Sequence, residues 1–341
     1  MGSDHRAMET AGPAAPRREG AASAARSRLL RAMAIQDWVL VAFLTMLTLA
    51  VAGSPPSPAQ RDVLRNVAVP LVLCVGALFA VRAELVRGGW AAPLLYRLTL
   101  LAGLLSPYLQ FRKLLPVVNP GSLDAALASL DRNVLGVEPA VWLERFATPA
   151  VTEWFAFFYF AYFLVLAAHV FPFLLLSRRS KLLAEFSLGM VLTVIVAHSL
   201  YLVVPGYGPY RFQPEAFRSP LPDGFWMRMV WAAVHSGGAQ KDIFPSLHTA
   251  APLFVALFSF RHRAQVPMRW TWHVTSFFAV NIVVATMFLR WHYATDVLAG
   301  IVLAVAASIV AARWAPREVD RRSMAGIAPV YPPLFGRPEL R

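Results

Sequence analysis

The sequence has few charged residues. Asp, Glu, Lys and Arg make up 15% of its 341 residues, whereas an ordinary soluble domain contains about 25%. Hydrophobic residues make up 57% and occur in long runs, which argues against a typical soluble enzyme. The composition therefore predicts an all-α fold, built as a polytopic membrane helix bundle.

Cysteine is almost absent. The one cysteine, Cys74, lies inside an apolar run. It cannot form an internal disulfide, and a thiolate metal centre is excluded. The 19 Asp and Glu residues form no cluster that suggests a metal site. We therefore expect neither a metal ion nor another cofactor in the mechanism.

The formal net charge is +13, and the basic residues flank the apolar runs. This distribution is typical of Lys and Arg retained on the inner side of a membrane. No nucleic-acid-binding motif interrupts the runs. We therefore expect membrane lipids as substrates and no nucleic-acid partner, while protein partners are not predicted.

Eight apolar segments are candidates to cross the membrane, for which a helix needs about 20 residues. We expect about eight transmembrane helices, and six at minimum. Residues 1–34 are predicted to be a disordered basic cytoplasmic tail, 35–110 the N-terminal transmembrane helices, 111–314 a catalytic membrane domain and 315–341 a cytoplasmic tail. The eight segments are Ile35–Ala52, Asn66–Ala83, Ala92–Gln110, Val151–Leu176, Leu182–Val204, Ser246–Phe260, Thr271–Arg290 and Asp296–Trp314.

Four basic groups give this path an orientation. They precede the first segment, follow the eighth, and lie in the loops after the fourth and the sixth. Eight spans place all four groups on one side, which the positive-inside rule makes cytoplasmic. The long loops 111–150 and 205–245 then lie on the outer side, where the sixth and eighth segments begin.

Two short motifs stand at those segment starts: Phe244-Pro-Ser-Leu-His248 and His292-Tyr-Ala-Thr-Asp296. His and Asp are costly near a bilayer, so their presence there points to a function. His292 and Asp296 are four residues apart and would share one face of a helix. The carboxylate could then orient the imidazole as a nucleophile, while His248 supplies a second imidazole for proton transfer.

These residues resemble the type-2 phosphatidic acid phosphatase superfamily, over roughly residues 100–312. More narrowly, they resemble its inositolphosphotransferase branch, which includes the fungal inositol-phosphorylceramide synthases. The resemblance rests on residues 245–248, on His292-Tyr-x-x-Asp296-Val, and on Asp131-Arg-Asn-Val-Leu-Gly136 followed by Pro139 and Trp142-Leu143.

The resemblance implies that 111–314 is a catalytic domain of the phosphatidic acid phosphatase type. It implies that His292 attacks phosphorus and forms a phosphohistidine, and that Asp296 orients it. It also implies that His248 protonates the leaving oxygen and later activates the acceptor.

The phosphate-binding residues are less well defined by the sequence. Ser246 and the amides at the start of the sixth segment could hold a phosphoryl oxygen. Arg290, Arg211 and Lys241 are the candidate cations. The phosphatase members of the family carry an arginine six residues before the nucleophile, where this sequence has Thr286.

The predicted function is an integral-membrane lipid phosphotransferase or phosphatase with a phosphohistidine intermediate at the outer membrane face. One alternative is pure hydrolysis of a lipid phosphate or polyprenyl pyrophosphate. A second is a non-catalytic membrane transporter or scaffold. High Ala and Arg usage favours a bacterial plasma membrane, with the site facing the periplasm or exterior.

Overall fold

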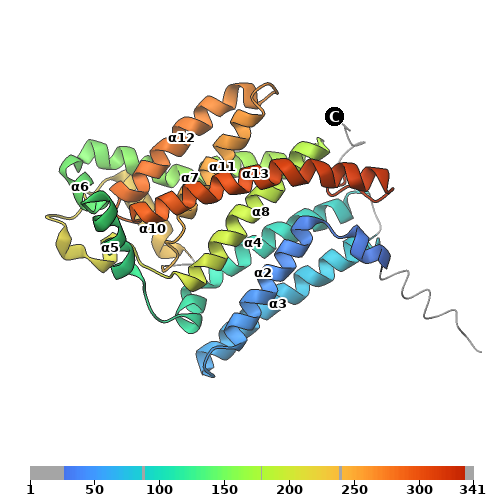
Figure 1. The fold of residues 1–341 in the computed structure, drawn as a ribbon, viewed down its shortest axis with the longest axis horizontal. Coiled ribbons are helices and arrows are strands. Elements are labelled where there is room, and N and C mark those ends of the chain that lie inside the picture. The colour runs from blue at the N-terminus through green and yellow to red at the C-terminus, as the bar shows by residue number, and fades with distance from the viewer. Residues whose placement is uncertain (1–26, 87–88, 178, 238–239, 335–341) are drawn as a thin grey trace, which may run out of the picture.

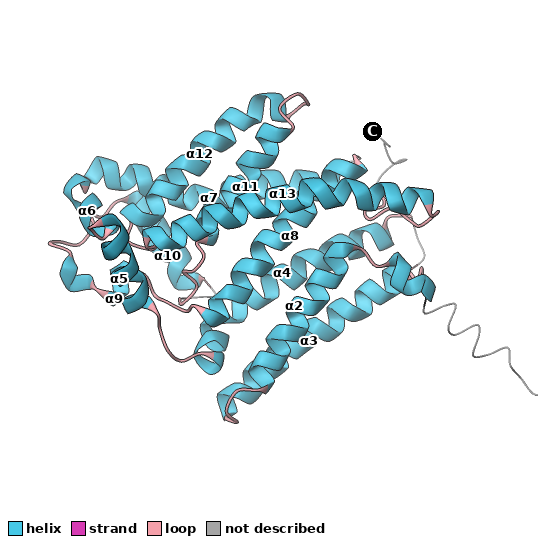
Figure 2. Ribbon diagram, viewed as in Figure 1, coloured by secondary structure: helices cyan, strands magenta, loops and turns pink. Residues whose placement is uncertain are grey.

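A computed structural model describes residues 27–86, 89–177, 179–237 and 240–334. Within these ranges, seven helices are long and apolar enough to cross a membrane, and α11 is a shorter apolar helix. The protein is therefore an all-α, integral multi-pass membrane protein, and its ribbon is built from helices and loops (Figure 2).

Two of the long helices begin where the sequence supplies a capping side chain. Ser57 and Thr148 each accept a hydrogen bond from the first turn, and a proline follows at the first helical position. The candidate spanning helices are α2 (Ile35–Ala52), α3 (Pro58–Arg82), α4 (Ala91–Val118), α7 (Pro149–Leu176), α8 (Ser180–Val203), α11 (Leu247–Arg261), α12 (Met268–Phe288) and α13 (Ala294–Met324).

Helix α8 lies at the centre of the bundle. It contacts α2 and α4 on one side and α11 and α13 on the other (Figure 1). Most of its residues are buried, and Phe186 and Met190 belong to the same apolar core as Phe254 and Phe258 of α11. Helix α8 therefore joins the N-terminal helices to α11 and α13.

Short helices gather at one end of the bundle. Helices α5 (Asp124–Leu135), α6 (Pro139–Leu143) and α10 (Phe225–Ser236) lie at the left in Figure 1, next to the first residues of α13. We call this the motif end. Residues 27–34 and the last turns of α13 lie at the right, which we call the terminal end.

Several helices extend beyond the apolar segments expected from the sequence. Helix α3 begins at Pro58 rather than Asn66, and α13 continues to Met324 rather than ending at Trp314. Residues 27–32, within the expected N-terminal tail, are helical, whereas residues 1–26 lie outside the described part of the chain. After α13, Tyr331 is buried and hydrogen-bonds Ser187 of α8.

Candidate active site

His292 lies in the turn between α12 and α13, two residues before α13 begins, rather than on the helix itself. A capping box closes the start of α13, in which Asp296 Oδ2 accepts a hydrogen bond from the N–H of Tyr293 (3.0 Å). The same oxygen lies 3.4 Å from Nδ1 of His292. A carboxylate held in this way orients the ring and leaves Nε2 as the nitrogen that can react.

His248 lies in the first turn of α11, where Ser246 accepts a hydrogen bond from the N–H of Thr249 (3.2 Å). Its ring stacks on Tyr159 with a centroid distance of 4.5 Å and packs against Tyr162 at 4.2 Å. Within the described structure, Nε2 of His248 is buried without a hydrogen-bond partner. An unpaired buried nitrogen costs free energy, so a substrate atom could usefully pair with it.

The two motifs are joined directly. The backbone N–H of Ser246 donates to the backbone oxygen of Asp296 (3.0 Å). A Cβ on Gly300 would lie 2.6 Å from the Ser246 oxygen, so only glycine allows α13 to approach α11 this closely. As a result, the rings of His248 and His292 lie close together, with centroids 6.3 Å apart and planes at 48°.

A chamber of about 60 Å³ borders both histidines. One water takes about 30 Å³ of the liquid, so the chamber has room for a small polar group rather than a whole lipid. Its described lining includes Tyr108, Tyr159, Tyr207, Tyr210, Val234, Gly237, Gln240, Asp242, Ile243, His248, Trp291 and His292.

Burial sets the protonation of two groups in the chamber. It lowers the pKa of His292 to about 4, although the nearby Asp242 carboxylate and the Ile243 backbone oppose that decrease. Burial raises the pKa of Asp242, which the proximity of His292 partly offsets. At neutral pH His292 is therefore an uncharged imidazole, the form that a nucleophile requires.

The loop 205–211 forms one wall of the chamber. Gly208 has φ of 86°, and a Cβ there would lie 2.1 Å from the backbone oxygen of Trp291. The loop is held by Asp124, whose carboxylate accepts hydrogen bonds from the N–H groups of Tyr207 (2.9 Å) and Gly208 (2.8 Å) and from the Tyr293 hydroxyl (3.2 Å). Asp124 thus ties this wall to the residue that follows His292.

A second aspartate fixes the start of α13 from outside. Asp131, at 1% exposure, accepts hydrogen bonds from the N–H groups of Ala294 (2.6 Å) and Thr295 (2.9 Å), and from the Thr295 hydroxyl. It therefore satisfies donors that the first turn of a helix leaves unpaired. The sequence pointed to the segment Asp131–Gly136 by resemblance alone and missed this contact.

The proposed cations do not line the chamber. Arg290 pairs with Glu144 (3.2 Å) and lies over the ring of Phe217. It borders a neighbouring pocket of about 390 Å³ that shares Tyr210 with the chamber. Backbone strain accompanies this position, because Arg290 has φ of 67°.

Lys241 donates to the backbone oxygens of residues 119–121 and holds that loop. Arg211 donates to Gln240 (2.9 Å), a residue of the chamber wall, and is exposed at its rim. Ser246 is fully buried, with its hydroxyl oxygen capping α11. The structure thus brings His248, His292 and Asp296 together, with Arg211 the nearest candidate cation to the opening.

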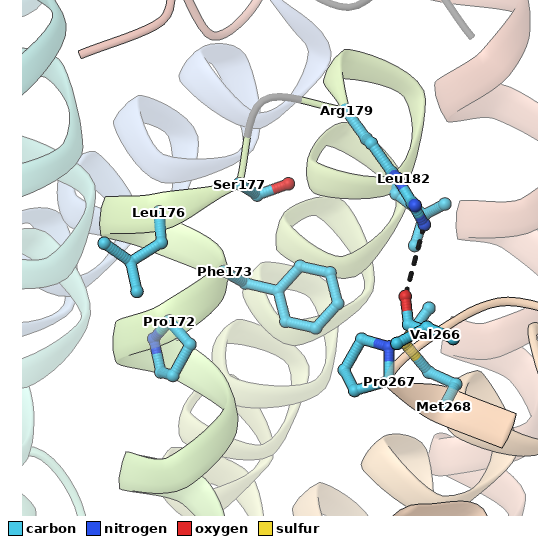
Figure 3. A pocket seen from close by; sticks show the side chains of 9 residues that line it. All are labelled: Pro172, Phe173, Leu176, Ser177, Arg179, Leu182, Val266, Pro267 and Met268. Atoms are coloured by element: carbon cyan, nitrogen blue, oxygen red, sulfur yellow. Dashed lines mark hydrogen bonds between the residues drawn. The ribbon is translucent and has the colours of Figure 1, made fainter. Parts of the chain in front are cut away.

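A different pocket, of about 310 Å³, lies where the α7–α8 connection meets the loop before α12 (Figure 3). Phe173, Pro267 and Met268 give it an apolar wall, and Arg179 crosses its edge to the backbone oxygen of Val266 (3.4 Å). No His, Asp or Glu is among the described residues that line it. Although larger than the chamber, it lacks groups for acid–base or nucleophilic chemistry.

Among the described residues, no group of three or more His, Cys, Asp or Glu side chains is arranged to hold a metal ion. Asp242 is the chamber residue that the sequence failed to identify. It stands six residues before His248 in a loop without periodic pattern, and its proximity to His292 depends on the tertiary fold.

The family model of the PAP2 superfamily matches residues 125–310, more than half of the chain. The chain belongs to the PAP2 superfamily. The match contains both histidine motifs and Asp131, while α2–α4 precede it. Curated proteins and solved structures yield no match. PAP2 superfamily members are phosphatases and phosphotransferases, so membership supports an enzyme of this class in a membrane.

Proposed function

We propose that this PAP2 protein is an integral-membrane lipid phosphotransferase, similar to the inositolphosphotransferases, with His292 as its nucleophile. The observation that carries the proposal is the opposition of His292 and His248 across the chamber. Reacting atoms in a near-attack complex lie about 3–3.5 Å apart, and a proton donor lies about 2.6–3.2 Å from its acceptor. The two ring centroids lie 6.3 Å apart and both rings border the same chamber, so a phosphoryl group bound there would be within reach of both imidazoles.

In the first step, Nε2 of His292 forms a bond to phosphorus while the bond from phosphorus to the leaving oxygen breaks. His248, whose protonated form the bound phosphate anion favours, gives its proton to that oxygen. In the second step, neutral His248 takes a proton from an alcohol or water, whose oxygen attacks phosphorus and releases His292. Asp296 stabilises the positive charge that His292 gains on attack.

The enclosure of the chamber favours transfer over hydrolysis. The short helices and the loop 205–211 cover the reacting groups, and exclusion of water lets a bound alcohol compete for the phosphohistidine. Hydrolysis of a lipid phosphate or polyprenyl pyrophosphate is the alternative outcome of the same intermediate. If the protein binds lipid but does not turn it over, the alternative function is a non-catalytic transporter or scaffold.

The decisive experiment uses the purified protein in detergent with phospholipid labelled in its head-group phosphate. Acid quenching is avoided, because phosphohistidine is labile, and label on the protein is located by mass spectrometry. We expect label on His292, and its accumulation in His248→Ala when the leaving group is good. Label moving into a new lipid on addition of diacylglycerol, ceramide or inositol supports transfer. Undiminished turnover by folded His292→Ala would contradict the mechanism.

We also propose that the motif end faces outward, to a periplasm or the cell exterior. This rests on the basic groups near the terminal end. In a Cys74→Ala background, cysteines at Gly237 and Gln265 should react with impermeant reagents from opposite sides of the membrane. Labelling of both from one side would overturn the topology.

A further inference from the structure

Asp242 places a carboxylate beside the proposed nucleophile. Its backbone is fixed by an isolated parallel bridge to Gly206, in which the N–H of Gly206 donates to the oxygen of Lys241 (3.2 Å). Gly206 belongs to the wall that Asp124 anchors. The side chain therefore has a defined position in the chamber wall, partly open to the chamber.

The groups that face this carboxylate are not cations at neutral pH. Asp242 interacts electrostatically with His292, which burial keeps uncharged. It also interacts with Tyr159 and Tyr162 of α7 and with Tyr201 of α8. Phenols can hydrogen-bond a carboxylate but bring no positive charge to it, so the ionised form of Asp242 presents its negative charge to the chamber.

No Lys or Arg occurs among the described residues that line the chamber. Lys241 is adjacent to Asp242 in the sequence, but its ammonium group donates hydrogen bonds to the backbone oxygens of residues 119–121. Arg290 is paired with Glu144. Arg211 stands at the rim, where it also lies over the ring of Tyr207. The described lining of the chamber therefore contains a carboxylate without a Lys or Arg beside it.

This charge balance discriminates between phosphate esters. A monoester carries about −1.5 to −2 at neutral pH, because its second pKa is about 6, whereas a diester carries a single negative charge. A dianion bound beside the Asp242 carboxylate is repelled more strongly than a monoanion, unless the ester or the carboxylate takes up a proton. Either way, the protein binds the dianion less tightly than the monoanion. Selectivity commonly uses such a repulsive element against the wrong partner.

We propose that Asp242 is a specificity-determining residue that makes the site prefer phosphodiester lipids over phosphomonoester lipids. This inference rests on the proposed function, because it assumes that phosphorus sits between His248 and His292. Asp242 acts on the charge of the bound ester and takes no part in bond making. Its removal should therefore alter the choice between substrates more than the rate on the preferred one.

The test compares phosphatidic acid with phosphatidylmethanol of the same acyl chains, which differ by one methyl group and one ionisable oxygen. The kcat/KM for each is measured at pH 8 in mixed micelles, for the parent protein and Asp242→Asn. We expect the parent to favour phosphatidylmethanol, and the variant to raise the relative kcat/KM for phosphatidic acid by about ten-fold or more.

Two variants control for a structural effect. Asp242→Glu keeps the charge and should keep the preference for the diester. Asp223→Asn removes an exposed carboxylate from the same long loop, where it pairs with Arg228 (2.9 Å), and should leave the ratio unchanged. If neither lipid is turned over, the thermal stabilisation that each lipid gives is compared instead, with the same expected order.

The inference and the proposed function fail differently. The role of Asp242 is overturned if the parent protein prefers phosphatidic acid. It is also overturned if Asp242→Asn has the same ratio of kcat/KM for the two lipids as the parent. Neither result contradicts His292 as the nucleophile. Turnover that survives His292→Ala overturns the proposed function. A ratio that shifts equally in Asp242→Asn and Asp223→Asn assigns the effect to general surface charge and also overturns the inference.

Discussion

The two ends of the bundle both bury polar side chains, but they treat them differently. At the terminal end, Asp37 accepts hydrogen bonds from Arg82 (2.7 Å), the Tyr96 hydroxyl (2.7 Å) and the N–H of Ala34 (2.8 Å), so both carboxylate oxygens are paired. At the motif end, Nδ1 of His292 and Oδ1 of Asp296 are buried without hydrogen-bond partners in the described structure.

This difference separates a structural cluster from a reactive one. Paired charges in a protein interior hold helices in place, and breaking the pair is costly. Buried groups left unpaired cost stability, and a protein that keeps them has a use for them. Changes at the motif end should therefore affect turnover, and changes at the terminal end should affect stability.

The largest effect is expected for His292→Ala. Removing the proposed nucleophile should lower kcat by about 10³-fold or more. The free energy of unfolding should change much less than in terminal-end variants, because Nδ1 of His292 lacks an ideal hydrogen bond in the free protein. Steady-state kinetics and thermal unfolding on one preparation measure both quantities. If His292→Ala were much less stable but kept the full kcat per folded molecule, the motif end would be the structural cluster and the comparison of the two ends would be wrong.

Arg82→Met tests the terminal end. It leaves the Asp37 carboxylate, at 0% exposure, without its charged partner, which should reduce the free energy of unfolding by about 3–5 kcal/mol. We expect kcat per folded molecule to stay at the parent value. Replacing both residues, as Asp37→Leu with Arg82→Met, should recover much of the stability. Equal losses in single and double variants would show that this ion pair is not what stabilises the terminal end.

Asp131→Ala is predicted to lower both kcat and the free energy of unfolding, each by less than the larger effect in His292→Ala or Arg82→Met. Loss of the contacts with Ala294 and Thr295 should cost about 1–2 kcal/mol as a lost helix cap. Misplacement of His292 by about 1 Å should lower kcat by up to about 10²-fold. Asp131→Asn retains one acceptor oxygen and should recover part of both. An unchanged kcat in Asp131→Ala would mean that the capping box alone positions His292.

The smallest effect concerns pH. Since burial lowers the pKa of His292 to about 4, the folded protein keeps this imidazole neutral where an unfolded chain, with a pKa near 6.5, takes up a proton. The unfolded state binds more protons between these values, so this group reduces stability as pH falls from about 6.5 to 4. Unfolding midpoints of the parent should fall more steeply over this interval than those of His292→Ala. Parallel curves would contradict the assignment.

The sequence predicted the helical membrane fold because apolar runs of spanning length leave few alternatives. It underestimated the lengths of α3 and α13. Their outer turns contain polar residues such as Arg61 and Asp320, so these turns fall outside the apolar segments that hydropathy identifies. It placed both histidine motifs at helix starts, because a short motif followed by an apolar run is a local signal.

The contacts around the motifs were not predictable in the same way. Asp124 and Asp131 reach residues 83 and 163 positions away, and a single aspartate in a mixed helix carries no pattern that reveals its partner. Arg290 looked like a phosphate ligand from its place beside His292. Its pairing with Glu144, 146 residues earlier, could be seen only after folding.

The hydrogen bond between Ser246 and Asp296, together with Gly300, has a consequence for protein engineering. Because α11 and α13 meet through backbone atoms and a glycine, residues 246–300 can be treated as one cassette, whose outside anchors are Asp124 on Tyr293 and Asp131 on the first turn of α13. The walls contributed by residues 119–146 and 205–242 are separate pieces of chain. Chimeras that exchange the rest of those walls and keep the cassette with Asp124 and Asp131 should therefore change which lipid is processed without moving the two imidazoles apart.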